Sequence, residues 1–191
     1  MFGEKSKASR PDSLDGEGMR RSFSFRFTTK NLVILGLLLA IEIVLSRFLS
    51  ITAWNIKIGF SFVPIIVTAI VFGPIPAAIV AGLGDFLGAL LFPIGPYFPG
   101  FTLTAVLTGL TFGFFLYERR SAWRRIAAVA VAQFVLSLLL NTLWISVLYA
   151  APYAPLLGTR IVQTAILSAL ELVVIWVLTD NQRFILMLKE R

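Results

Sequence analysis

Hydrophobic residues are gathered into six long segments, which are separated by shorter polar or proline-containing stretches. To within a few residues the segments cover 29–48, 58–73, 75–92, 99–117, 123–149 and 157–179. A helix of about 20 apolar residues crosses the hydrocarbon core of a bilayer. Because a backbone in lipid must satisfy its hydrogen bonds internally, the pattern predicts an all-α integral membrane protein with six transmembrane helices.

Proline and glycine mark the interruptions between these segments. The second segment is the shortest and contains Pro64, which predicts a kink or a tilted half-helix. Gly73-Pro74-Ile75-Pro76 predicts a tight turn before the third segment. Two further prolines, at 152 and 155, separate the last two segments.

Residues 1–28 differ from the rest of the chain because they are mostly polar and charged. Such a composition cannot bury enough apolar surface to fold, so we predict a disordered basic tail, followed by a membrane domain over residues 29–191. The tail lacks the apolar core and cleavage site of a secretory signal. The first apolar segment is therefore expected to remain as an uncleaved anchor.

Composition supports the membrane interpretation and narrows the chemistry. Hydrophobic residues make up 58% of the 191-residue chain, and the mean hydropathy is +0.87, well above that of a soluble domain. The chain contains no cysteine and no histidine. The commonest general base and the commonest ligands of zinc are therefore missing. We expect neither an enzyme nor a metal site, and no cofactor.

Positive charges are unevenly distributed along the chain. With six spans both termini lie on one side, and all but three of the 17 basic residues fall there. They are Lys5, Lys7, Arg10, Arg20, Arg21, Arg26, Lys30, Arg119, Arg120, Arg124, Arg125, Arg183, Lys189 and Arg191. The positive-inside rule predicts that this side is cytoplasmic. Topology thus accounts for the net charge of +7, and no nucleic-acid partner is expected.

Arg47, Lys57 and Arg160 are the three basic residues left for the outer half. Lys57 is as well explained by contact with lipid headgroups as by ligand binding. Arg47 and Arg160 lie within or beside apolar segments, where an ionisable group usually faces the interior and marks a ligand path. An arginine side chain can bind a carboxylate through two parallel hydrogen bonds. Together the three cations predict an anionic ligand with more than one carboxylate.

A polar stripe runs along the fifth apolar segment. Gln133, Ser137 and Asn141 recur at spacings of four, and Trp144 follows three residues later. We expect Gln133 and Ser137 to join helices through hydrogen bonds. Asn141 lies far enough along the helix to share a level with the outer cations, so we expect it to bind ligand.

Asp85 is an acidic residue deep in the third apolar segment. A lone carboxylate in a membrane is costly and raises the hypothesis of a functional role, such as a proton relay. Gly82, Gly84, Gly88 and Ala89 surround it, however, and small residues let a neighbouring helix approach closely. We therefore expect Asp85 to make a structural hydrogen bond.

The stretch from Leu91 to Thr102 contains three prolines, two glycines and four aromatic residues, but no charge. It cannot be an ordinary helix interior, because each proline lacks an N–H. Two interpretations stay open. It either lines a ligand cavity, where irregular backbone is tolerated in a membrane protein, or it is an interfacial turn with its rings among the headgroups.

Residues 72–102, from Phe72-Gly73-Pro74 through Gly82-Leu83-Gly84-Asp85 to Phe98-Pro99-Gly100-Phe101-Thr102, resemble the third and fourth helices of the substrate-binding S components of energy-coupling factor (ECF) vitamin transporters. The similarity is greatest to the folate-type subfamily. Residues 46–50, 57–62 and 141–144 and Arg160 also fit that subfamily, so that the resemblance covers about residues 30–180.

This resemblance implies a multi-pass protein of a bacterial cell membrane that captures folate in an outer-half pocket. A folate has two carboxylates for the cations and a flat pterin for aromatic rings and an amide. The candidate ligand-binding residues are Arg47, Lys57, Gly59, Phe60, Phe62, Phe92, Tyr97, Phe98, Gly100, Asn141, Trp144, Arg160 and Gln163. The chain has no Walker motif, and the family supplies a coupling membrane subunit and two ATPase subunits as partners.

Gly36 and Ala40 form a pair of small residues that allows close helix packing. S components are similar to one another in an alanine pair at this spacing, which docks to the coupling subunit, so these two residues are the docking candidates. On an ideal helix Gly36 and Arg47 project on nearly the same face. The helix must then bend or end before Arg47, or the docking assignment is wrong.

Two other functions remain open. The chain could be an S component for another anionic vitamin, such as pantothenate. It could also be a membrane scaffold without a ligand, in which the proline-rich stretch is only a turn.

Overall fold

The computed structural model describes residues 28–53, 56–117 and 121–180, which form helices and one two-stranded hairpin. The predicted disordered tail lies almost entirely outside these residues. In chain order the elements are α2 (Thr29–Arg47), β1 (Ser50–Ala53), β2 (Ile56–Gly59), α3 (Phe62–Phe72), α4 (Pro74–Leu91), α5 (Pro99–Leu116), α6 (Ala122–Ala130), the π-helix η1 (Val131–Leu140), α7 (Asn141–Tyr149) and α8 (Tyr153–Asp180).

The six apolar segments correspond to six helices, because α6, η1 and α7 form one continuous helix, Ala122–Tyr149. Five helices in the described part of the chain are long and apolar enough to cross a membrane. The sixth, α3, has only 11 residues. It is the most buried helix, and Ile66 and Ala69 are completely enclosed. The all-helical membrane fold is confirmed, with five spans of full length.

A β-hairpin, not predicted from the sequence, leads from α2 to α3. Ser50 on β1 pairs with Gly59 on β2 in an antiparallel register. Consequently α3 begins only at Phe62, and Pro64 lies in its first turn, where a missing N–H costs no helix hydrogen bond. Of the two predicted alternatives, the kink is therefore absent, and the segment is a short helix of 11 residues that follows a hairpin.

Glycines let α4 and α5 pack closely side by side. A Cβ atom on Gly113 would overlap the backbone of Pro74, and one on Gly109 would overlap the carbonyl of Ala77. The predicted turn at Gly73 is confirmed: its φ of 90° suits glycine, and Pro74 starts α4. The two helices thus form a rigid antiparallel pair, joined by residues 92–98.

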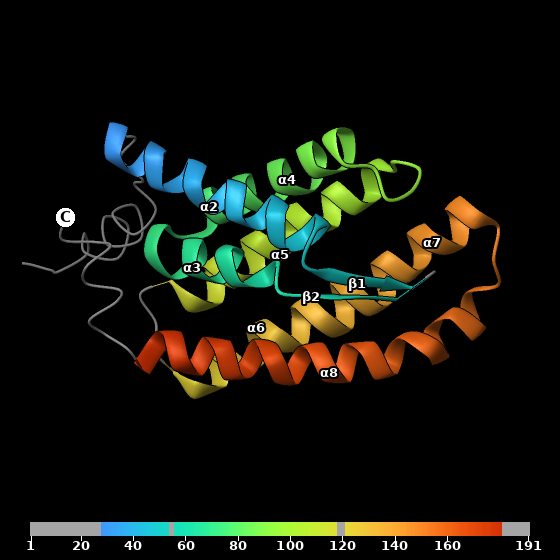
Figure 1. Cartoon of the computed structure of the whole chain (residues 1–191). Helices are drawn as coiled ribbons and strands as arrows, with labels where there is room; N and C mark the ends of the chain where they lie inside the picture. The colour runs from blue at the N-terminus through green and yellow to red at the C-terminus, as the bar shows by residue number, and fades with distance from the viewer. Residues whose placement is uncertain (1–27, 54–55, 118–120, 181–191) are drawn as a thin grey trace, which may run out of the picture.

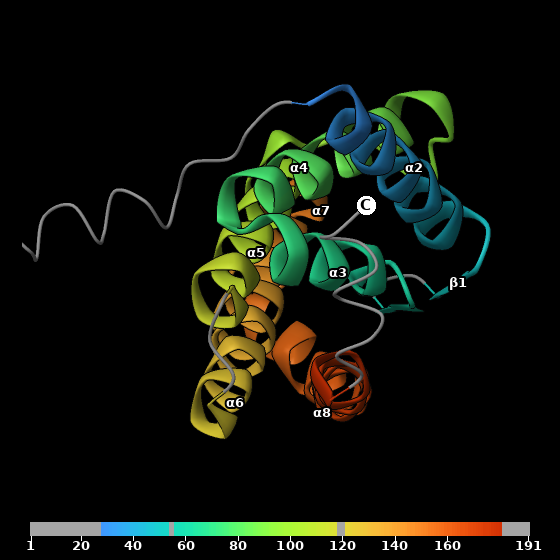
Figure 2. The ribbon, with the colours of Figure 1, turned by 90° about the vertical axis from the view of Figure 1, so that its left-hand side faces the viewer.

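α3 is surrounded by α2, α4, α5 and α8, and α6 packs against α5 and α8 (Figure 2). Ile66, Phe112, Ala128 and Ile175 come from four of these helices and meet in the core. Figure 1 shows that α2 begins and α8 ends at the same end of the bundle. At the other end lie the hairpin, residues 92–98 and the turn between α7 and α8. This second end is called the hairpin end below.

Candidate functional site

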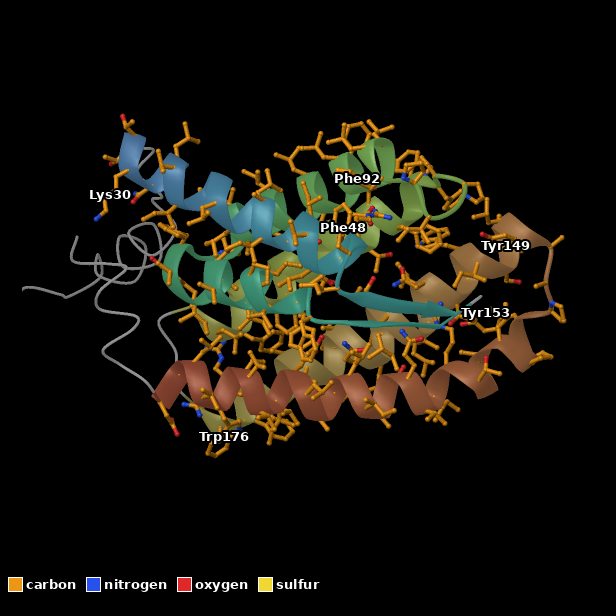
Figure 3. All side chains as sticks on the ribbon, in the orientation of Figure 1. Lys30, Phe48, Phe92, Tyr149, Tyr153 and Trp176 are labelled. Atoms are coloured by element: carbon orange, nitrogen blue, oxygen red, sulfur yellow. The ribbon has the colours of Figure 1, made fainter. Side chains whose placement is uncertain are left out.

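The predicted ligand-binding residues lie on the elements that meet at or lead to the hairpin end. Figure 3 shows Phe48 and Phe92 beside each other where α2 and α4 end, and Tyr149 and Tyr153 on either side of the next turn. Lys30 and Trp176 mark the opposite end. Seven of the thirteen predicted residues form three groups, which are described in turn.

The first group is centred on Arg47, the last residue of α2. Its Nη2 atom donates a hydrogen bond of 3.2 Å to the backbone carbonyl of Asp85 and lies 3.8 Å from the carboxylate atom Oδ1. Gly88 makes room for the guanidinium, because a Cβ atom there would lie 2.7 Å from Nε. Thr102 donates a hydrogen bond of 2.7 Å to the other carboxylate oxygen of Asp85. Asp85 thus joins α2, α4 and α5.

The second group contains Arg160, near the start of α8. Its side chain is buried, and Nη2 donates a long hydrogen bond of 3.4 Å to the carbonyl of Ser137. Within the described part of the chain Arg160 forms no ion pair, and Nε has no hydrogen-bond partner. The amide oxygen of Asn141 is also buried without a partner there. Gln163 lies one turn further along α8 and is buried too.

The backbone beside Arg160 is unusual. Residues 131–140 form a π-helix in the middle of the continuous helix that ends at Tyr149. Such wide turns are rare and occur frequently at functional sites. Ser137, whose carbonyl contacts Arg160, lies within this stretch, and Asn141 follows it directly.

The third group is aromatic and joins α5 to α7. The rings of Phe98 and Trp144 are 5.6 Å apart, and the indole N–H of Trp144 donates a hydrogen bond of 3.0 Å to Thr104. Gly100 is required at this contact, since a Cβ atom would lie 2.6 Å from the indole. The structure therefore brings together three predicted site residues, Phe98, Gly100 and Trp144.

Other predicted site residues do not belong to these groups, although the hydroxyl oxygen of Tyr97 lies 3.3 Å from that of Thr102. Phe92 and Tyr97 are 42% and 40% exposed, so the connection between α4 and α5 is open from Phe92 to Tyr97. Phe62 belongs to the core, whereas Phe60 is exposed. Each of these rings contacts another aromatic ring, and Phe92 packs edge-on against Phe48 at 5.0 Å.

Two site candidates lie on β2. Gly59 has a structural reason to be glycine, because a Cβ atom would lie 2.8 Å from the Cβ of Ser50 on β1. Lys57 lies opposite Thr52 in the hairpin rather than at the start of a helix. The predicted ligand contact of its ammonium group stays a prediction.

Several polar residues with clear contacts were missed by the sequence analysis. Glu42 is buried and packs on α4, where a Cβ on Gly84 would overlap its carboxylate. The sequence could have identified Glu42, since it is the sole acidic residue of the first apolar segment. The contacts of Thr102 and Thr104 could not be predicted from the sequence, because threonine is common in apolar helices. The predicted interhelical bond of Gln133 is confirmed: its amide donates to Glu171 on α8 at 2.5 Å.

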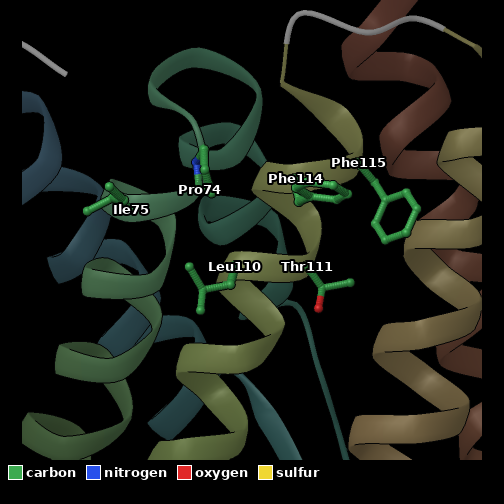
Figure 4. Close-up of a pocket in the computed structure, with 6 residues that line it drawn as sticks. All are labelled: Pro74, Ile75, Leu110, Thr111, Phe114 and Phe115. Atoms are coloured by element: carbon green, nitrogen blue, oxygen red, sulfur yellow. The ribbon is translucent and has the colours of Figure 1, made fainter. Parts of the chain in front are cut away.

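A hollow of about 450 Å³ lies at the end of the bundle remote from these groups. Figure 4 shows it between the start of α4 and the end of α5, and its lining is almost wholly apolar. It is lined by Pro74, Ile75, Leu110, Thr111, Phe114 and Phe115. None of these is a predicted ligand-binding residue, and the lining offers no charge for an anion.

Comparison with known proteins identifies the family. A family model described as "ECF transporter, substrate-specific component" matches residues 30–179. The chain belongs to this family. It is a component of a membrane transporter, and its relatives are substrate-specific components rather than enzymes.

Individual relatives agree with this assignment. The chain is 36% identical over 154 residues to "Folate transporter FolT" of Clostridium novyi (strain NT), covering 78% of this chain and 90% of that protein. It is 26% identical over 174 residues to a protein of the same name from Leuconostoc mesenteroides subsp. mesenteroides, covering 87% and 94%. A crystal structure of FolT bound with folic acid superposes with a TM-score of 0.76 at 33% identity, covering 81% of this chain and 95% of that one.

Proposed function

We propose that this chain is the folate-capturing subunit of an ECF importer, with its ligand site at the hairpin end. The observation that carries the proposal is the buried guanidinium of Arg160, which has no carboxylate partner among the described residues. A buried charge without a counter-ion is costly. A ligand carboxylate would supply the counter-ion, and the named folate relatives indicate which ligand carries it.

The other two groups fit the remaining parts of a folate. Arg47 would receive a second carboxylate, because its Nε has no hydrogen-bond partner in the described part of the chain. The amide oxygen of Asn141 would accept a hydrogen bond from the pterin, and the rings of Phe98 and Trp144 would offer it flat apolar surfaces.

The exposed face of α2 supports docking to a coupling membrane subunit. Gly36 has no atom within 4 Å of the position of its Cβ, and Ala40 is exposed. Arg47 lies on nearly the same face, but its long side chain turns to Asp85 on α4. Docking and ligand binding can therefore share this helix, because the side chains that contact α4, Glu42 and Arg47, come after Gly36 and Ala40. ATP hydrolysis would take place in two separate ATPase subunits.

A titration of the purified chain with related ligands tests the proposal. We expect folic acid to bind tightly, and pterin without the glutamate to bind at least about 100-fold more weakly, because a buried hydrogen-bonded charge contributes several kcal/mol. Pantothenate serves as the control for another anionic vitamin and should not compete. Equal affinity for folic acid and pterin would reject the carboxylate assignment. Binding of pantothenate alone would reject folate, and binding of no ligand would favour a scaffold.

A further inference from the structure

The carboxylate of Asp85 lies at the centre of a hydrogen-bonded chain that links three helices. Thr102 donates to Oδ2 at 2.7 Å, and Arg47 approaches Oδ1 to 3.8 Å while it donates to the backbone carbonyl of the same residue. The hydroxyl oxygen of Tyr97 lies 3.3 Å from that of Thr102. Because Thr102 gives its single proton to Asp85, Tyr97 must donate to Thr102.

Every donor in this series of hydrogen bonds therefore points toward Asp85. Tyr97 belongs to the exposed connection between α4 and α5, whereas the side chain of Arg47 is only 10% exposed. This series of hydrogen bonds thus connects the exposed segment that contains Tyr97 to the nearly buried guanidinium of Arg47. Arg47 uses Nη2 for both contacts with Asp85, so its other terminal nitrogen, Nη1, is not engaged by Asp85.

We propose that Asp85 is a positioning residue for ligand binding: it orients the guanidinium of Arg47 toward a ligand carboxylate and ties it, through Thr102 and Tyr97, to the connection between α4 and α5. The proposal rests on the proposed role of Arg47 in folate binding. It differs from a purely structural role for Asp85, because it makes the effect of Asp85 depend on Arg47.

A double-mutant cycle separates these two roles. Asp85→Asn keeps the shape of the side chain and an oxygen for Thr102 but removes the charge that faces Arg47. We expect it to weaken folic acid binding about tenfold, because the guanidinium loses the carboxylate charge 3.8 Å away while its hydrogen bond to the backbone carbonyl of residue 85 remains. Binding of pterin should not change. In the Arg47→Ala background Asp85→Asn should have no further effect, because the guanidinium that it orients is absent.

The hydroxyl of Thr102 gives a second test that leaves the charges intact. Thr102→Val should weaken folic acid binding severalfold, and Thr102→Ser should restore it, since serine keeps the donor. Thr111→Val is the matched control: the Thr111 hydroxyl bonds to Leu107 of its own helix, and the residue lies beside the remote hollow. This control should bind like the unaltered chain. If Asp85→Asn does not fold, the comparison of Thr102→Val with Thr102→Ser still tests the proposal.

Three results would overturn the proposal while folate binding itself stands. They are unchanged folic acid affinity in Asp85→Asn or Thr102→Val, an equal loss of pterin and folic acid affinity, and an equal effect of Asp85→Asn with and without Arg47. Failure of the unaltered chain to bind folic acid would reject both this proposal and the proposed function.

Discussion

At the scale of single residues, the basic side chains differ most in what neutralises them. Arg125, at the start of the Ala122–Tyr149 helix, lies 3.7 Å from Asp180 and stacks over Trp176 at 5.1 Å. Arg47 has Asp85. Arg160 is as buried as Arg125 but has only the carbonyl of Ser137 at 3.4 Å, within the described residues. The burial of a cation thus does not by itself indicate a ligand site, and Arg160 stands out because it also lacks a counter-ion among the described residues.

Replacing Arg160 tests this distinction. We expect Arg160→Ala to weaken folic acid binding by about 2–5 kcal/mol, the usual cost of removing one partner of a buried charge pair. Arg160→Lys should recover only part of it, because an ammonium group cannot form the two parallel bonds of a guanidinium. Calorimetric titration measures both values.

Arg125→Lys is the matched control, a buried arginine with the same change at the other end of the bundle. It should leave folic acid affinity unchanged. A loss as large as that of Arg160→Lys would attribute the effect to a general loosening of the fold. Full affinity in Arg160→Ala would remove Arg160 from the proposed site.

The sequence indicated which residues are unusual but not what they contact. Arg47, Asp85 and Arg160 could be identified because charges are rare in apolar segments. The pairing of Arg47 with Asp85 could not be predicted, because the two residues are 38 positions apart on different helices. Glu42 was overlooked although it carries the same signal. The division of the 91–102 stretch into exposed Phe92 and Tyr97 and packed Phe98 and Gly100 likewise depends on α7, which no local pattern reveals.

At the scale of elements, helix limits were predictable and the hairpin was not. The fourth segment was expected at 99–117 and is the helix Pro99–Leu116, because proline starts it and the apolar run ends with it. The second segment was read as helical from residue 58, yet Ile56–Gly59 is a strand. A strand of four residues next to a buried helix continues the same apolar run, and periodicity cannot separate the two.

The open face of α2 leads to a prediction about docking. Gly36→Leu adds a side chain where the isolated protein has only open space, and leucine favours helix more than glycine does. The purified variant should therefore fold and bind folic acid normally. Uptake in cells that contain the transporter partners should be lost, because the added side chain keeps a partner helix at a distance.

Ala130→Leu is the control for this substitution. Ala130 is also exposed, but it lies on α6, far from α2 when the bundle is viewed from its end (Figure 2). Uptake by this variant should match the unaltered chain. Unchanged uptake in Gly36→Leu would remove Gly36 from the docking surface, and a joint loss of uptake and binding would place this part of α2 in the fold or the ligand site.

At the scale of the whole molecule, the two ends of the bundle differ in structure. The end where α2 begins and α8 ends holds Lys30, Arg124 and Arg125 among the described residues. The hairpin end holds residues 92–98, the turn between α7 and α8, and the candidate site. A substrate-capturing subunit of an importer must present its ligand site to the outside, and the positive-inside rule, applied to the basic residues of the full sequence, predicts that the end where α2 begins and α8 ends is cytoplasmic. The two arguments give the same orientation.

Cysteine labelling can test this orientation directly, because the natural chain contains no cysteine. Ser121 and Ala154 are both exposed, and they lie just before α6 and in the first turn of α8, at opposite ends of the bundle. A maleimide that cannot cross membranes should label Ala154→Cys in intact cells. It should label Ser121→Cys only after the cells are permeabilised. The reverse pattern would invert the topology and place the proposed folate site in the cytoplasm, where an importer cannot use it for capture.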